Sequence, residues 1–218
     1  MTTHFEQDLE GIRIKFFKMA DLAIDAVYQS VEALRQSDSR LARSVIENDN
    51  LLDALEKEID EDCIRFLVTR QPAAVDLRFV LVMLKSNTDL ERIGDLSSNI
   101  AKECIKLGGK PPMKALVDIP RMAAIAVEMV RDTFTAIAEK NSMRARLVVK
   151  RDDEIDDLNT QVYRELFSYM METPHTISQA LGLIMVSKSL ERIGDHISNI
   201  AERAVYYIEG VDIRHSMI

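Results

Sequence analysis

The sequence predicts an all-α fold made of two tandem antiparallel three-helix bundles, one for each copy of an internal repeat. Helix-forming residues dominate the 218-residue chain, which has only seven Gly and five Pro and is 47% hydrophobic. Apolar residues recur at steps of three and four through most of its length, as on one face of a helix. The segment ERIGDLSSNIA at 91–101 returns as ERIGDHISNIA at 191–201, identical at nine of eleven positions. A repeat of this kind indicates two copies of one structural unit.

Three helices are expected in the first half. One apolar stripe runs over residues 5–34 and a second over 41–66. The pattern then breaks at Pro72, and because proline is tolerated in a first helical turn, a third helix is expected to begin there and to run to about residue 107. Amphipathic helices with short connections bury their stripes by packing antiparallel.

The second half repeats this order after the segment LGGKPPMK at 107–114, a cluster of Gly and Pro near the midpoint of the chain. The predicted domains are therefore a first bundle at 1–108, a linker at 109–113 and a second bundle at 114–218. Helices are expected over 122–138 and about 144–171, and a last one begins at Pro174, which has the role of Pro72.

Acidic residues four apart form the candidate site, because that spacing puts two carboxylates on one helical face. In each half one pair lies in the second helix and one in the third, each following the apolar stripe by about one residue. Adjacent antiparallel helices can bring such edges into one groove, so four carboxylates are expected to converge in each half. The candidate ligands are Asp49, Asp53, Glu91 and Asp95, then Asp152, Asp156, Glu191 and Asp195.

Hard oxygen ligands without a compensating basic pair are typical of a site for a multivalent cation, and ligand type alone leaves Fe, Mn, Mg, Zn and Ca open. Asn99 and Asn199 are expected either to be further ligands or to donate hydrogen bonds to the ligating carboxylates. Gly94 and Gly194 lie in mid-helix, where glycine is unfavourable, so a metal, a water or backbone is expected to come too close there for a side chain.

Other polar residues receive plainer interpretations. Arg92 and Arg192 are expected to form salt bridges with neighbouring carboxylates. His196, five residues after Glu191, is expected to point away from the site. The two cysteines, 63 and 104, lack metal or redox spacing and are interpreted as buried thiols.

Charge and the N-terminus restrict the class of protein. A formal net charge of −8 argues against nucleic acid as a ligand. The N-terminal residues lack the apolar core of a secretion signal, and the chain has no window resembling a membrane span. A cytoplasmic protein that does not insert into the membrane is expected. Catalysis has little support because no nucleophile elbow, phosphate-binding glycine loop or zinc spacing is present.

The same residues carry a family resemblance. SYMMETPHTISQALGLIMVSKSLERIGDHISNIAERAVYY, at 168–207, closely resembles the C-terminal signature of the PhoU family of bacterial phosphate-transport accessory proteins. RQPAAVDLR and LERIGDLSSNIAK resemble its first-half counterpart, and the likeness covers essentially the whole chain. The resemblance implies two pseudo-twofold three-helix bundles whose acidic motifs, the eight residues above, hold metal ions or multinuclear clusters. One departure is His175, where the family usually has arginine.

The resemblance further implies a negative regulator of the phosphate-starvation response, which links the ATPase subunit of the phosphate ABC importer to a sensor histidine kinase. A divalent or trivalent ion such as Fe, Zn, Mn or Mg and a homodimer are expected with it, and enzymatic turnover is not. Two alternatives stay open: a metal-dependent hydrolase or oxidase using the same carboxylates, and a metal-free helical scaffold.

Overall fold

The computed structural model describes residues 4–108 and 116–214. The predicted linker at 109–113 lies outside these residues. The helices are α1 (His4–Gln36), α2 (Ser39–Arg70), α3 (Ala74–Lys106), α4 (Asp118–Glu139), α5 (Ser142–Glu172), the one-turn 3₁₀ helix η1 (Pro174–Thr176) and α6 (Ile177–Glu209).

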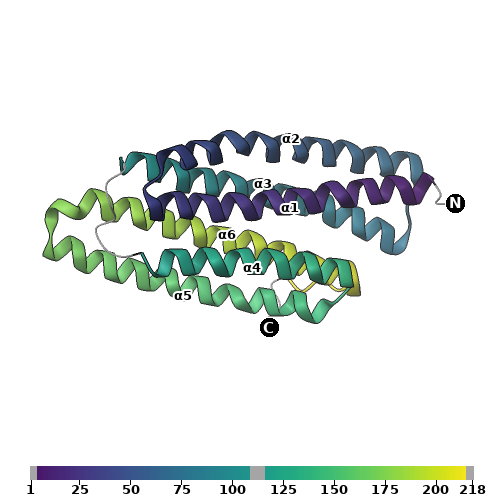
Figure 1. Ribbon diagram of the computed structural model, residues 1–218. Helices are drawn as coiled ribbons and strands as arrows, with labels where there is room; N and C mark the ends of the chain where they lie inside the picture. Colours follow the sequence, from purple (N-terminus) through teal and green to yellow (C-terminus); the bar gives the residue numbers. More distant parts are fainter. Residues whose placement is uncertain (1–3, 109–115, 215–218) are drawn as a thin grey trace.

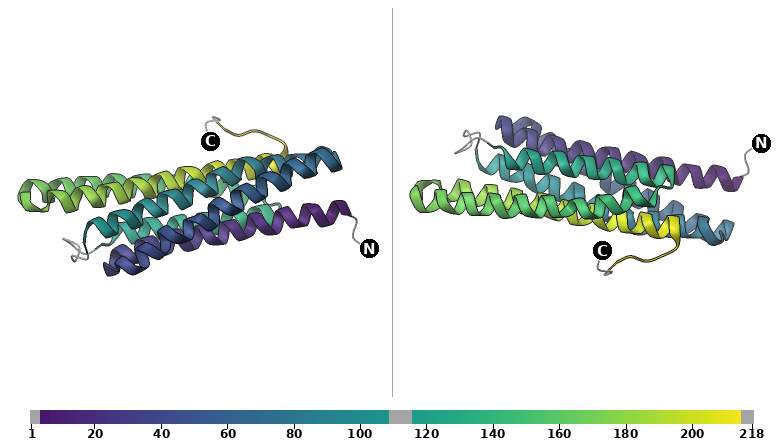
Figure 2. Two further views of the ribbon diagram at one scale, coloured as in Figure 1. Left: turned by 90° about the horizontal axis from the view of Figure 1, so that it is seen from above. Right: turned by 90° about the horizontal axis from the view of Figure 1, so that it is seen from below.

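The described residues form two antiparallel three-helix bundles lying side by side (Figures 1 and 2). Helices α1 to α3 make the first bundle and α4 to α6 the second, so the predicted all-α, two-repeat fold is confirmed. Helices α3 and α6 pack against each other along the middle of the molecule, and α1 packs on α4. No helix in the described ranges combines the length and the apolarity that crossing a bilayer requires.

Local sequence explains where several helices begin and end. The Asp38 carboxylate accepts hydrogen bonds from the first amides of α2, and the Asn141 side chain caps α5 in the same way. The predicted start of the third helix at Pro72 is two residues early: α3 begins at Ala74, and Pro72 lies in the connection before it. Pro174 does begin a helical turn, but that turn is the separate 3₁₀ helix before α6.

A single apolar core runs through both bundles. Where α1 packs on α4, Phe134 contacts both Phe16 and Phe17, with ring centroids 4.9 Å and 5.2 Å apart. Cys63 and Cys104 are free thiols buried in this core, as expected. Because the core is shared, the helices of one repeat are held in register with those of the other.

A polar clasp crosses the interface between α3 and α6. Asp89 Oδ1 lies 2.8 Å from His196 Nδ1, and Asp89 Oδ2 also pairs with Arg203. All three side chains are largely buried. His196 thus points away from the acidic residues beside it, as the sequence indicated. The clasp has no twin, since the equivalent positions in the other repeat are Ser189, Leu96 and Glu103.

Candidate metal centres

The predicted ligands lie on two pairs of packed helices, and the four carboxylates on each pair are called here the first groove and the second groove. The first groove is made by Asp49 and Asp53 of α2 with Glu91 and Asp95 of α3. The second groove is made by Asp152 and Asp156 of α5 with Glu191 and Asp195 of α6. In each bundle these are the two helices after the first connection, which run antiparallel side by side (Figure 1).

Glycine lets the two helices of each groove approach closely. A Cβ on Gly94 would lie 2.8 Å from Asp49 Oδ1 and would overlap Leu52 Cδ1. A Cβ on Gly194 would overlap Asp152 Oδ1 in the same way. The protein atoms closest to both glycines are side chains of the facing helix and not its backbone. The glycines therefore seat the aspartates of one helix against the backbone of the other.

The carboxylates of the second groove act on one another. The pKa of Asp152 is raised to about 7, first by burial and then by the negative charges of Asp195 and Asp156. Burial followed by the charge of Glu191 also raises the pKa values of Asp156 and Asp195. All four predicted residues therefore lie within electrostatic reach of each other, and the groove favours either a proton or another cation.

The first groove shows the same effect in weaker form. Burial is the main cause of a raised pKa at both Asp49 and Glu91, and the charge of Asp95 adds to it at both. Asp53 contributes to both shifts as well. Carboxylates of both helices therefore influence one another in the first repeat as well, and their role as metal ligands stays a prediction.

Basic side chains partly neutralise both grooves, contrary to the expectation of uncompensated carboxylates. Arg92 Nη1 lies 3.0 Å from Asp95 Oδ2, which confirms the predicted salt bridge in the first groove. In the second groove Lys188 Nζ lies 2.6 Å from Glu191 Oε1, whereas Arg192 acts on Asp195 only through its charge. The counterpart of Lys188 in the first repeat is Thr88.

A serine that the sequence analysis missed completes the first groove. Ser98 Oγ donates a hydrogen bond to Asp49 Oδ2 at 2.9 Å. The signal was present, since serine stands four residues after glycine in both copies of the repeated segment. Asn99, which was expected near the ligands, is exposed and accepts a hydrogen bond from Lys102 instead. Ser98 rather than Asn99 is therefore the polar neighbour that orients a groove carboxylate.

The donor set fits a hard cation best in the second groove. Asp152 Oδ1 and Glu191 Oε2 are buried there without any hydrogen-bond partner. The neighbouring Ser198 hydroxyl opposes the rise in the pKa of Asp152, but its oxygen also lacks a partner in hydrogen-bond geometry. Within residues 4–108 and 116–214, no three Asp, Glu, His or Cys side chains are already arranged around one point as a metal site. The buried, unpartnered oxygens are nevertheless what a bound cation would satisfy.

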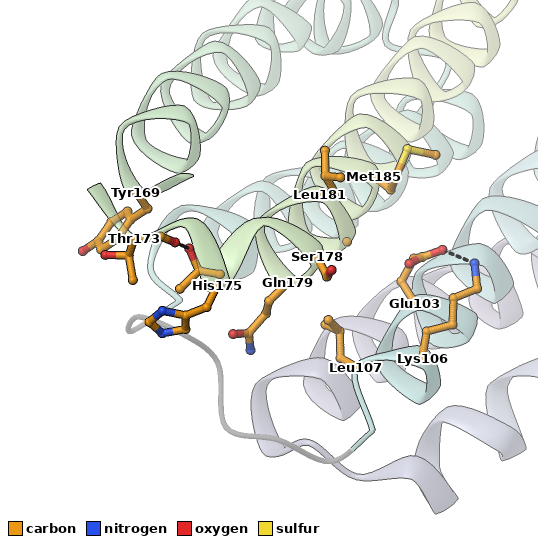
Figure 3. A pocket seen from close by; sticks show the side chains of 12 residues that line it. Glu103, Lys106, Leu107, Tyr169, Thr173, His175, Ser178, Gln179, Leu181 and Met185 are labelled. Carbon is orange, nitrogen blue, oxygen red and sulfur yellow. Dashed lines mark hydrogen bonds and ion pairs between the residues drawn. The ribbon is translucent and has the colours of Figure 1, made fainter. Parts of the chain in front are cut away.

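His175, the departure from the family pattern, is not part of either groove. It belongs to η1 and lines a hollow where the ends of α3, α5 and α6 meet (Figure 3). Thr176 next to it bonds back to Thr173, which closes this turn.

Comparison with known proteins gives one consistent result. The family model described as the PhoU domain matches residues 16–104 and 119–204, one match in each repeat. The phosphate-specific transport system accessory protein PhoU homolog of Pseudomonas aeruginosa is 39% identical over 217 residues, covering 99% of this chain and 89% of that protein. PhoU of Escherichia coli is 34% identical, covering 97% of this chain and 88% of that protein.

Solved structures agree with these sequence matches. The crystal structure of PhoU from Pseudomonas aeruginosa superposes with a TM-score of 0.91 at 38% identity, covering 95% of this chain and all of that chain. The phosphate transport system regulatory protein PhoU from Streptococcus pneumoniae gives 0.89 at 27% identity, with coverage of 96% and 99%.

Proposed function

The chain belongs to the PhoU family, and from that premise we propose that it is a metal-binding cytoplasmic adaptor that restrains phosphate uptake and the phosphate-starvation response. Its curated relatives are named as accessory proteins of phosphate-specific transport systems. The two partners in this proposal are the ATPase subunit of the phosphate ABC importer and a phosphate-sensing histidine kinase.

The observation that carries the metal part of the proposal is the pair of buried, unpartnered carboxylate oxygens in the second groove, Asp152 Oδ1 and Glu191 Oε2. Oxygen ligands of this kind suit Mg, Mn, Fe or Zn, and two or more ions fit a row of four carboxylates. A bound cation supplies positive charge. The chain's own contribution is to hold the two acidic helix edges together, which their mutual repulsion opposes.

The regulatory part follows from that repulsion. A cation bound by both helices of a groove stabilises the arrangement in which those helices lie close, and a ligand always favours the state that binds it. The outer surfaces of the bundles would then keep one shape for the transporter ATPase and the kinase. Metal is in this proposal a structural effector, and turnover is not required.

Elemental analysis of protein purified without a metal-affinity tag tests the metal sites. Wild type should contain stoichiometric metal, and replacement of Asp152 and Glu191 by Asn and Gln should remove the share held by the second groove. A matched control replaces the exposed Asp153 and Glu154, which lie on the same helix as Asp152. Equal metal content in all three proteins would exclude these ligands, and no metal in any of them would leave a metal-free scaffold.

Binding assays test the adaptor role separately. The purified ATPase subunit and the cytoplasmic part of the kinase should each bind the wild-type chain, and deletion of the gene should raise phosphate uptake and starvation-gene expression. Normal regulation in the deletion strain would refute the proposed role, whatever metal the protein carries.

A further inference from the structure

Arg92 of α3 contacts two of the four carboxylates proposed as ligands in the first groove. Its Nη1 lies 3.0 Å from Asp95 Oδ2, and its Nε lies 3.5 Å from Glu91 Oε2. A guanidinium is planar and carries five N–H donors, so one arginine can serve two carboxylates at once. Arg92 therefore supplies the positive charge that a bound cation would otherwise bring to Glu91 and Asp95.

The second repeat lacks this contact, although it has the same arginine. Arg192 occupies the position of Arg92 in the repeated segment ERIGD. Within residues 116–214 it forms no ion pair with Glu191 or Asp195, and it acts on Asp195 only through its charge. Lys188 pairs with Glu191 instead, through one carboxylate oxygen, Oε1. A basic side chain thus contacts two proposed ligands in the first groove and one in the second.

The grooves also differ in how far their carboxylate oxygens already have partners. In the second groove Asp152 Oδ1 and Glu191 Oε2 are buried without a hydrogen-bond partner. Among the residues that the structure describes, no carboxylate oxygen of the first groove is in that state, and Asp49 Oδ2 accepts a hydrogen bond from Ser98. A buried oxygen that has lost its water and found no partner gains most from a cation. The second groove is therefore expected to hold a cation more tightly than the first.

We propose that the two grooves bind divalent cations with unequal affinity, and that Arg92 lowers the affinity of the first groove by competing with the cation for Glu91 and Asp95. This inference rests on the metal sites proposed above. The Arg92 side chain is 53% exposed, so it can turn into solvent when a cation replaces its two ion pairs. As the supply of cation falls, the first groove empties before the second. The first groove is then the one that responds to a change in supply, while the second keeps its helices together.

Binding of Mn²⁺ to the chelator-treated full-length chain tests the proposal, with the electron paramagnetic resonance signal of the free ion as the readout. Each groove is measured while the other is disabled by replacing two of its carboxylates. Asp152→Asn with Glu191→Gln leaves the first groove, and Asp49→Asn with Asp53→Asn leaves the second. The second groove is expected to bind Mn²⁺ at least about fivefold more tightly than the first.

Replacement of Arg92 tests the competition directly. With only the first groove intact, Arg92→Gln should tighten Mn²⁺ binding by at least about fivefold, because it removes both ion pairs and the positive charge. Arg92→Lys keeps the charge and should stay within about twofold of the parent protein. The internal repeat supplies the matched control: with only the second groove intact, Arg192→Gln should tighten binding by less than about twofold. Both arginines are exposed, so these changes leave the apolar core untouched.

The possible outcomes separate this inference from the function on which it rests. Mn²⁺ binding that Arg92→Gln leaves unchanged, or that Arg192→Gln strengthens to the same degree, would overturn the role of Arg92 and leave the metal sites standing. A first groove that binds Mn²⁺ as tightly as the second would overturn the unequal affinities. No Mn²⁺ binding by the unmodified chain would also overturn the inference, and the elemental analysis described above then decides separately on the metal sites.

Discussion

In the metal-free protein, the free energy of unfolding is expected to fall as the pH rises and Asp152 loses its proton. Replacing Asp152 by Asn should remove most of this fall. The pKa of Asp152 is raised from 3.8 to about 7, because the carboxylate is buried and faces Asp195 and Asp156. A folded-state pKa above the unfolded value means that the folded protein holds the proton more tightly. Its contribution to stability is complete below pH 4 and is lost as the pH rises through 7.

The size of this effect follows from the shift. Three units correspond to about 4 kcal/mol at 1.36 kcal/mol per unit, and solvent screening of the partly buried Asp152 reduces this to about 2 kcal/mol. The assay is urea unfolding followed by circular dichroism in chelator, at pH 5 and pH 8. Because only about two of the three units fall above pH 5, wild type should lose about 1 kcal/mol more between these values than Asp152→Asn, whereas Asp49→Asn, the same change in the first groove, should have a smaller effect. Equal losses in wild type and Asp152→Asn would refute the electrostatic argument.

Three further outcomes are expected. Gly194→Leu should lower the free energy of unfolding by about 1–3 kcal/mol, because a large side chain would be forced into the space held by Asp152 and Ile155 of the facing helix; an unchanged thermal midpoint would contradict this. Asp89→Ala should cost about 3 kcal/mol in urea unfolding because it leaves Arg203 unpaired at the interface of the repeats, whereas Ser189→Ala should cost less than about 0.5 kcal/mol. The Cys63 thiol, whose pKa burial raises to about 12, should resist a thiol reagent at pH 8 until the protein is unfolded, and rapid labelling of the native chain would disprove its burial.

The sequence was sufficient for the helices and for the acidic grooves because both depend on short-range spacing. Apolar residues three and four apart reveal the buried face of a helix, and carboxylates four apart share an edge of it. The two-residue error at the start of α3 arose because proline can stand either inside the first turn or before it. Here Pro72 stands before it, and Gln71 and Ala74 on either side take left-handed backbone conformations.

Contacts between helices were beyond such spacing arguments. The hydrogen bond from Ser98 to Asp49 and the close approach at Gly94 depend on the register of α2 against α3, which no single-helix pattern fixes. The pairing of Lys188 with Glu191 is local, but a lysine on a charged helix gives no sign of whether it turns towards a groove or to solvent. The proposed metal ligands themselves remain predictions for the elemental analysis to test.

The clasp of Asp89, His196 and Arg203 favours pairing between unlike repeats. If two copies of the first repeat met through α3, Asp89 would face Glu103, and the two like charges would repel. If two copies of the second repeat met through α6, Arg203 would face Ser189 and lose its counter-ion at a largely buried position. Only the unlike pair satisfies every charge, so the interface discriminates between partners by penalising the wrong ones. Although the repeated segments are nearly identical, the α3 face of one repeat is therefore complementary to the α6 face of the other repeat and not to a second copy of itself.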